Sequence, residues 1–528
     1  MINPKAAPCD EATIRSIPLA ANCIASQKRW VLLATVLASS ITYIDESVVN
    51  IAQPAIEGNL ATSVAVIQWL VNAYTLCLSA LLLTGGAAAD QFGRRKMFVI
   101  GIVLFAVASL WCGFAPSVVQ LILARAMQGF GAAILIPCSL ALIGASFDEE
   151  ERGKAIGTWA GVSAIAVASG PLLGGLIVDH FSWRLIFLIN PLLAVPTIWI
   201  VYNHVPESQG PEVTGRLDWT GAVLALLGLT GVCFGLIAAP EFGLIDIKVF
   251  SPLAVGLVLL CFFIWLEGHS DTPMLPLDLF RSRTFSAVNL LTLLLYAALG
   301  DAFFFLPFAL IQVGGYSAVL AGAVFLPFTI VMGLLSRWSG GLIDRIGARL
   351  PLIIGPTITA LGFGLLAICI GRDAYWTFLA AMVVLGLGMA ASVAPLTTTV
   401  INAVPAHQTG AASGVNNAVA SLAGLLAVAL FGAVALGIYG RGLERRLQAP
   451  AASVELSQII ESARGQFVTA PPAAMSTAVD RQLAARFIKG SLAESIRDIM
   501  LLAGILALGA AASGALLPRR AQPTSGPG

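Results

Sequence analysis

Apolar segments long enough to cross a membrane recur along almost the whole chain, and they limit its fold more than any other feature. A bilayer core about 30 Å thick needs a helix of roughly 17–25 apolar residues. We find fourteen such segments, at residues 30–51, 66–87, 97–115, 118–142, 155–178, 184–203, 217–238, 250–267, 285–311, 318–338, 350–371, 375–399, 411–438 and 496–517. The sequence therefore predicts an all-α membrane protein with fourteen transmembrane helices.

The composition points to the same class. Of the 528 residues, 58% are hydrophobic and 11% are charged, whereas soluble domains carry about 25% charged residues. The mean hydropathy is +0.89, and a soluble fold could not bury that much apolar surface. The net charge of +1 gives no reason to expect a nucleic-acid partner. The lipid bilayer is the expected surrounding.

Basic residues flanking the segments predict the orientation. An even number of helices puts both termini on one side. Six groups of basic residues fall on the side of the N-terminus: Lys28/Arg29, Arg94/Arg95/Lys96, Arg152/Lys154, Arg281/Arg283, Arg345/Arg349 and Arg519/Arg520. Because cytoplasmic loops carry an excess of Lys and Arg, we expect the tails 1–29 and 518–528 to be cytoplasmic.

One polar segment, 439–495, conflicts with this rule. It contains several arginines, yet the topology places it outside. Long loops follow the charge rule weakly, so the topology is kept. For residues 441–464 we expect an amphipathic helix that lies on the outer face.

A loop sequence occurs twice at corresponding places. "GGAAADQFGRR" (85–95) follows the second segment and "SGGLIDRIGAR" (339–349) follows the tenth. A second pair agrees, since "GFGAA" (129–133) is matched by "GLGMA" (386–390) at nearly the same offset. These matches predict two six-helix bundles that run in the same direction.

The offset is too long for six helices, which predicts an insert between the bundles. The expected domains are an N-terminal bundle (30–203), a linker with two extra transmembrane helices (204–284) and a C-terminal bundle (285–517) that includes the outer loop 439–495.

Two adjacent acids, Asp45 and Glu46, interrupt the first apolar segment. A charge at membrane depth costs at least about 2.5–3.5 kcal/mol on insertion scales. Neighbouring helical residues point about 100° apart, so one acid can face a cavity and the other a neighbouring helix. Two buried carboxyls cannot easily both ionise, which suits a proton relay. The alternative is that the helix ends at Ile44 and that the pair is interfacial.

Two further charges lie inside apolar segments. Arg125 cannot lose its proton, so it is a fixed charge that needs a partner, and Gln128 or an acid is expected to supply it. Snorkelling to the interface is the alternative. Asp301 is the only acid of the ninth segment and stands among phenylalanines. It could meet a cationic substrate or cap a helix break after Gly300.

The architecture and its motifs together resemble the major facilitator superfamily and, more narrowly, the fourteen-helix drug:proton antiporters. The resemblance covers residues 30–517. It rests on "GAAADQFGRRK" (86–96), "RAMQGFGAA" (125–133), "GTWAGVSAIAVASGPLLGG" (157–175), "WRLIFLINP" (183–191) and "IDESVVNIAQP" (44–54). Gln91, Ala166 and Glu46 depart from the usual pattern. The resemblance implies that Asp45 lies inside the first helix, and that the chain exports drugs.

The repeated loop is expected to take part in gating. Its glycines allow positive φ and close backbone approach, and its acid can pair with a base or a helix N-terminus. A plain structural turn is the alternative. The residues concerned are Gly86, Asp90, Gly93, Arg94 and Arg95 in the first copy, and Asp344, Arg345 and Gly347 in the second.

Small residues and a proline mark the fifth segment as the hinge implied by the antiporter resemblance. Small residues let helices approach closely, and proline bends the axis. Ordinary close packing is the alternative. The residues are Gly157, Gly161, Gly170, Pro171, Gly174 and Gly175.

We therefore predict a proton-coupled antiporter that exports amphipathic or cationic small molecules by alternating access from a bacterial inner membrane. Its expected partners are a small-molecule substrate and protons, and the chain is expected to be a monomer. Whether a periplasmic adaptor also binds is left open. No GxxxxGK[ST] motif occurs, so no ATP-driven step is expected. The histidines and cysteines are scattered and no two cysteines are spaced as a metal pair, so no metal site, cofactor or enzymatic activity is expected either. The alternatives are a proton-coupled importer or exporter of one metabolite, a membrane enzyme, and a sensor or scaffold.

Overall fold

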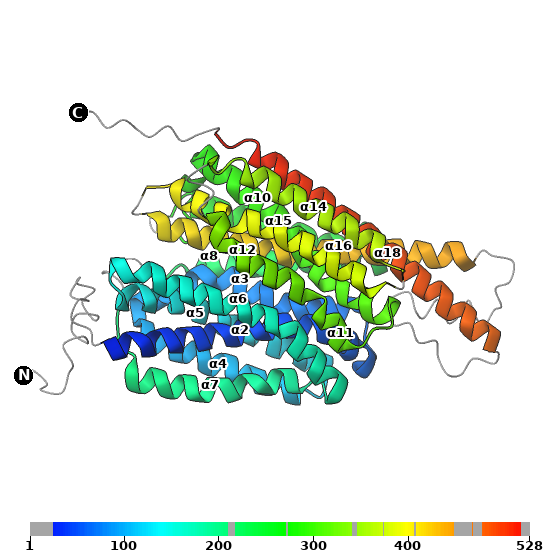
Figure 1. Cartoon of the computed structure of the whole chain (residues 1–528), viewed down its shortest axis with the longest axis horizontal. Helices are drawn as coiled ribbons and strands as arrows, with labels where there is room; N and C mark the ends of the chain where they lie inside the picture. Colours follow the sequence, from blue (N-terminus) through cyan, green and yellow to red (C-terminus); the bar gives the residue numbers. More distant parts are fainter. Residues whose placement is uncertain are drawn as a thin grey trace, which may run out of the picture. The chain divides into compact units, whose positions relative to one another are not determined.

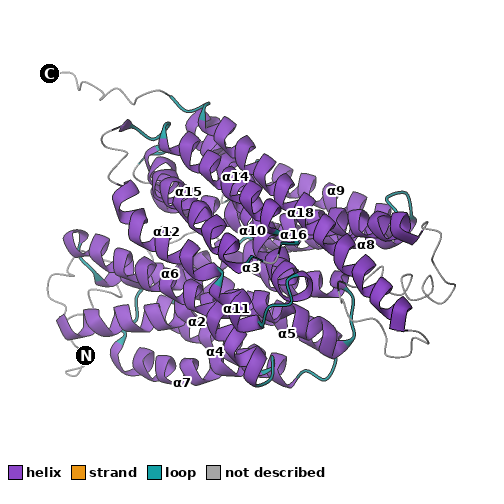
Figure 2. Cartoon of the chain, turned by 45° about the vertical axis from the view of Figure 1, so that its right-hand side comes forward, coloured by secondary structure: helices purple, strands orange, loops and turns teal. Residues whose placement is uncertain are grey.

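Helices of membrane-spanning length make up nearly all of the computed structural model. It describes residues 25–209, 217–270, 273–340, 346–372, 374–405, 408–447, 467 and 478–518, and no strand occurs in these ranges. Fourteen helices in them are long and apolar enough to cross a membrane, which confirms the predicted fold class. Figures 1 and 2 show the helices and the short loops between them.

The first eight spanning helices are α2 (Ala25–Leu60), α3 (Val64–Phe92), α4 (Arg94–Phe114), α5 (Val118–Ser146), α6 (Glu149–His180), α7 (Leu185–His204), α8 (Trp219–Phe242) and α9 (Ile247–Glu267). A short helix, η2 (Leu277–Arg281), follows them. The other spans are formed by α10 (Arg283–Phe308) with η3 (Ala309–Val313), α11 (Ala318–Ala323) with α12 (Phe325–Gly340), α14 (Pro351–Cys369), α15 (Tyr375–Asn402), α16 (Thr409–Leu447) and α18 (Ala478–Gly514).

Three helices are much longer than hydropathy predicts. Helix α2 continues to Leu60 through Pro54, so the alternative that it ends at Ile44 is wrong. Helix α16 continues to Leu447 and α18 begins at Ala478. Residues 441–447 therefore extend α16 and are not part of a separate interfacial helix, and residues 448–464 lie outside the described ranges. Hydropathy marks only the apolar part of a helix, so it misses polar turns beyond the bilayer.

The chain divides into two compact units. Unit 1 comprises residues up to Leu275 together with Ser317–Gly322, and unit 2 comprises Pro276–Tyr316 and the chain from Ala323 onward. Helices α8 and α9 belong to unit 1, where they pack on each other and α8 packs on α3. The tails and the boundaries predicted for the three domains stay predictions.

The repeated glycine motif has the same packing role in both units. In unit 1, Gly129 of α5 lies against the backbone of α3 at Tyr74, and Gly131 lies against α4 at Phe105. In unit 2, the matching Gly386 of α15 lies against α12 at Phe328, and Gly388 lies against α14 at Thr359. A side chain at any of these positions would force the helices apart. The two copies of the motif therefore pack in the same way in their own units, as the predicted internal repeat requires.

Candidate functional site

A buried ion pair lies at the centre of unit 1. Arg125 Nη1 of α5 contacts Asp45 Oδ2 of α2 at 2.5 Å, and the two side chains are 1% and 0% exposed. Asp45 stands near the middle of the candidate span Gln27–Leu60. The structure thus brings together two residues that the sequence marked separately, and Arg125 does not snorkel to an interface.

Three polar side chains complete the coordination of this pair. Gln128 accepts from Arg125 Nη1 at 2.9 Å and donates to Asp45 Oδ1 at 3.1 Å. Asn190 of α7 donates to the same Oδ1 at 2.6 Å. Ser109 of α4 accepts from both amides, at 2.7 and 3.2 Å. Because every one of these groups is buried, the network holds the Asp45 carboxylate by charge and by hydrogen bonds.

Aromatic rings close the site around the guanidinium. Arg125 Cζ lies 4.4 Å from the ring centroid of Tyr74 on α3 and 5.9 Å from that of Phe187 on α7. Its Nε donates to the carbonyl of Leu70. Five helices of unit 1 therefore supply the network, and such cation–π contacts stabilise a desolvated guanidinium.

Asn190, Ser109 and Tyr74 were not predicted from the sequence. Asn190 lies inside "WRLIFLINP", a stretch that marked the family resemblance without suggesting a role for the amide. A polar residue in an apolar segment was the available signal. Ser109 and Tyr74 gave none, because serine and tyrosine are common in buried helices.

Glu46 does not join the network. Its side chain is exposed, whereas that of Asp45 is buried, as expected for neighbouring residues on a helix. The two carboxyl groups therefore share no hydrogen bond among the described residues, although the charges of Asp45 and Arg125 act on Glu46.

Asp301 is buried in unit 2 without a described partner. Its side chain is 0% exposed, and neither carboxyl oxygen has a hydrogen-bond partner among the residues that the structure describes. The preceding residue, Gly300, lies against Gly424 of α16. Helix α10 continues through Asp301 to Phe308, so the alternative that Asp301 caps a break after Gly300 is wrong.

The loop motif between α3 and α4 is a tight, charge-paired turn. Gly93 has φ 103°, in the region that only glycine enters readily. Asp90 pairs with Arg94 at 2.8 Å, and Arg94 also donates to the carbonyl of Ala141 on α5. The acid thus bonds to a base within its own turn, one of the two arrangements considered for it. Gly86 lies in ordinary contact with Pro137.

Glu207, which the sequence analysis missed, occupies the N-terminus of α4. It accepts from the backbone N–H groups of Arg95 and Lys96 at 2.9 and 3.1 Å. A carboxylate at this position satisfies free N–H groups and complements the helix dipole. In the second copy of the motif, Gly347 has φ 77°, while Asp344 and Arg345 lie outside the described residues.

The small residues of α6 do not all serve close packing. Gly170 and Gly174 lie against Ser47 and Val48 of α2, and Gly175 lies against the backbone of Ala318. Pro171 stays within the continuous helix. By contrast, no atom of the described residues lies within 4 Å of a Cβ placed on Gly157 or Gly161. Close packing in unit 1 therefore involves only the second half of the motif.

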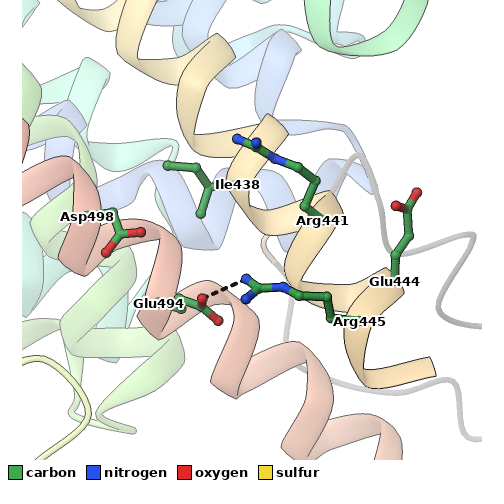
Figure 3. Close-up of a pocket in the computed structure, with 6 residues that line it drawn as sticks. All are labelled: Ile438, Arg441, Glu444, Arg445, Glu494 and Asp498. Carbon is green, nitrogen blue, oxygen red and sulfur yellow. Dashed lines mark hydrogen bonds and ion pairs between the residues drawn. The ribbon is translucent and has the colours of Figure 1, made fainter. Parts of the chain in front are cut away.

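A charged pocket of about 540 Å³ lies between the long ends of α16 and α18 in unit 2. Figure 3 shows the Arg445–Glu494 pair that crosses it. The pocket is lined by Ile438, Arg441, Glu444, Arg445, Glu494 and Asp498. Its charges of both signs tie the two helices together, and it contains none of the residues predicted for coupling.

Comparisons with known proteins agree with this architecture. The sequence model described as Major Facilitator Superfamily matches residues 35–428. Multidrug resistance protein Stp of Mycobacterium tuberculosis (strain CDC 1551 / Oshkosh) is 33% identical over 424 residues, which cover 79% of this chain and 78% of Stp. Puromycin resistance protein pur8 of Streptomyces alboniger is 34% identical over 435 residues, covering 81% of this chain and 86% of pur8.

A solved structure shares the fold. It is that of a bacterial homolog to the human lysosomal transporter Spinster, in an inward-facing and unoccupied conformation. It matches with a TM-score of 0.65 at 14% identity, and the match covers 95% of this chain and all of that one.

Proposed function

Because the chain belongs to the Major Facilitator Superfamily, we propose that it is a proton-coupled antiporter that exports amphipathic or cationic small molecules by alternating access. The observation that carries the proposal is the buried Asp45–Arg125 pair near the middle of α2. An ionisable pair at this depth is by default a functional site. The printed names of the relatives, a multidrug resistance protein and a puromycin resistance protein, favour export of drug-like compounds.

Asp45 is the proposed proton carrier and Arg125 its fixed counter-charge. Three donors, from Arg125, Gln128 and Asn190, hold the carboxylate. A proton arriving on Asp45 cancels its charge and weakens the contact with Arg125. When the contact re-forms, the proton leaves. If these two events occur on opposite sides of the membrane, the pair exchanges a proton for cargo.

Asp301 is the proposed contact for a cationic cargo in unit 2. It is buried and has no partner among the described residues. A carboxyl in that position is least costly to bury with its proton on, and an arriving cation can replace the proton. Glu46, exposed on α2, is a second acid available to a cation. The turns at Asp90 and Gly347 are proposed to act in gating, and α6 as the hinge.

The available energy is sufficient for such an exchange. For a neutral cargo, the one proton charge crossing ~100 mV is worth about 2.3 kcal/mol, which supports a roughly fifty-fold substrate gradient because about 1.4 kcal/mol is tenfold. For a monovalent cation exchanged one for one, no net charge moves and the pH difference is the driving force. We propose that both termini face the cytoplasm of a bacterium and that the chain works as a monomer, with the polar segment 439–495 outside, where a periplasmic adaptor could bind.

Everted membrane vesicles test the coupling. A proton gradient is imposed, a cationic or a neutral amphipathic dye is added, and collapse of the gradient and dye accumulation are both followed. We expect wild-type vesicles to accumulate dye at the expense of the gradient and Asp45→Asn vesicles to do neither. The matched control is Asp278→Asn, because Asp278 is 78% exposed and its ion pair among the described residues is the surface pair with Arg281.

The same experiment separates the proposal from its alternative, a proton-coupled importer or exporter of a single metabolite. Proton-coupled accumulation of several unrelated dyes supports a drug exporter. No dye accumulation in wild-type vesicles, together with uptake of one metabolite, supports the alternative. Unchanged coupling in Asp45→Asn would refute the role of Asp45.

A further inference from the structure

Helices α8 and α9 end in a second pair of acids that the transport proposal does not use. Glu267, the last residue of α9, is 2% exposed. Its Oε2 accepts from the backbone N–H of Leu275 at 2.8 Å, and the backbone of Met274 also bonds to it. Asp218 precedes α8 and its Oδ1 accepts from the N–H of Gly221 at 2.8 Å.

The remaining oxygens of these carboxyl groups face each other. A Cβ on Gly221 would meet Asp218 Oδ2 at 2.5 Å and Glu267 Oε1 at 2.8 Å, so both oxygens occupy the same small space. Among the described residues, neither oxygen has a hydrogen-bond donor. Two ionised carboxylates can only accept hydrogen bonds, and their negative charges repel each other when the oxygens lie this close.

The two helix ends decide which acid can remain charged. Asp218 lies at the N-terminus of α8, where the dipole and the Gly221 N–H favour a negative charge. Glu267 lies at the C-terminus of α9, where the dipole opposes one. Among the described residues, His269 is the titratable residue nearest to Glu267 along the chain. Its Nδ1 lies 2.8 Å from the carbonyl oxygen of Trp265, and its ring packs at a tilt against the Trp265 ring. The α3 residue near this loop, Thr84, is uncharged.

We propose that the Glu267 carboxyl group is protonated and that its O–H donates a hydrogen bond to the Asp218 carboxylate. The two acids then form a proton-binding site separate from Asp45. One proton between two acceptor oxygens turns repulsion into a charge-assisted hydrogen bond. The site needs no proton to cross the membrane, and the inference does not depend on the transport proposal.

This site fixes the chain where unit 1 ends. Glu267 holds Leu275, the last residue before Pro276 of unit 2. The neighbouring Met274 accepts from Thr84 Oγ1 at 3.0 Å, just before the loop motif that begins at Gly86. When the proton leaves, the charge on Glu267 is repelled by Asp218, and the side chain moves out of its buried position. The N–H groups of residues 274 and 275 then lose their acceptor.

Infrared difference spectroscopy on the purified full-length protein detects the proton. The carboxylic-acid C=O band that disappears as the pH rises is recorded for wild type, Glu267→Gln and Asp218→Asn. We expect both variants to lack one component of the band. The matched control is Asp246→Asn. Asp246 caps α9 through the N–H of Lys248 as Asp218 caps α8, but it is only half-buried, and no hydrogen bond links it to a second acid among the described residues.

Hydrogen exchange of the peptide that contains Leu275 tests the consequence. After correction for intrinsic rates, we expect wild-type exchange to accelerate by about tenfold or more as the proton leaves. Glu267→Gln should stay protected at all pH values, because its amide donates to Asp218 permanently. An infrared band that is the same in wild type and both variants would overturn the proton site. If protection in wild type does not change with pH, the link to Leu275 is wrong.

Discussion

Arg125 Nη1 bonds to both Asp45 Oδ2 and Gln128 Oε1, at 2.5 and 2.9 Å, from a side chain that is 1% exposed. One guanidinium thus connects a carboxylate on α2 with an amide on its own helix. The planar group also donates through Nε to the carbonyl of Leu70 on α3, and a lysine ammonium offers no such second, fixed donor nitrogen.

Removing only one partner of this pair should cost more than removing both. We expect Arg125→Ala to lower the free energy of unfolding by about 3–5 kcal/mol, because it leaves the Asp45 charge buried and unpaired. The double variant Arg125→Met with Asp45→Asn should recover much of that loss. Thermal melts in detergent measure the cycle. Arg184→Ala, at a half-exposed arginine stacked on Trp183, is the control. Additive losses in the double variant would contradict the pairing.

Asp301→Asn should separate cargo selectivity from folding. The amide has the shape of the carboxyl group and, like the protonated acid, carries no charge, so we expect the variant to fold and insert as the wild type does. Transport of a cationic dye should fall strongly, while transport of a neutral amphipathic dye should continue. Uptake of both dyes into the same everted vesicles gives the ratio. Equal losses for both dyes would show that Asp301 does not select charge.

The glycines of α6 offer a matched pair of substitutions. A Cβ on Gly170 would overlap Ser47 of α2, so Gly170→Ala should cost about 1–3 kcal/mol by overpacking. Gly157→Ala should be neutral or stabilise by up to about 1 kcal/mol, because no described atom lies within 4 Å of the added Cβ and alanine favours a helix. Urea or thermal melts compare the two. If both substitutions have the same effect, α6 does not pack on α2 as described.

The two turn glycines differ in the space around them. Gly93→Ala combines a left-handed backbone with a Cβ 3.0 Å from the Glu207 carboxyl group, whereas a Cβ on Gly347 meets no atom of the described residues within 4 Å. We expect about 1–2 kcal/mol of backbone strain in each and a further loss only at Gly93. If Gly93→Ala acts by disrupting the contact with Glu207, then adding Glu207→Ala to it should lower the free energy of unfolding no further. Melting curves of the three variants decide this.

Local sequence was sufficient to predict the helices and the repeat. Apolar segments of membrane length specify helices because each backbone group bonds within its own segment. The glycines at 93 and 347, with φ 103° and 77°, were found because a turn of this kind needs glycine at a fixed place. The repeated motifs at Gly129 and Gly386 were also found, because closely packed helices need small residues at the contact and such residues stand out in an apolar sequence.

Tertiary structure alone decided the partners of the buried charges. The sequence marked Asp45 and Arg125 but could not pair them, because they are 80 positions apart and many polar residues were available. Asn190, Glu207 and the facing acids Asp218 and Glu267 became recognisable only when separate helices met. A helix depends on neighbouring residues and can be read from a local pattern, whereas a buried charge depends on whichever group packing brings within about 3 Å.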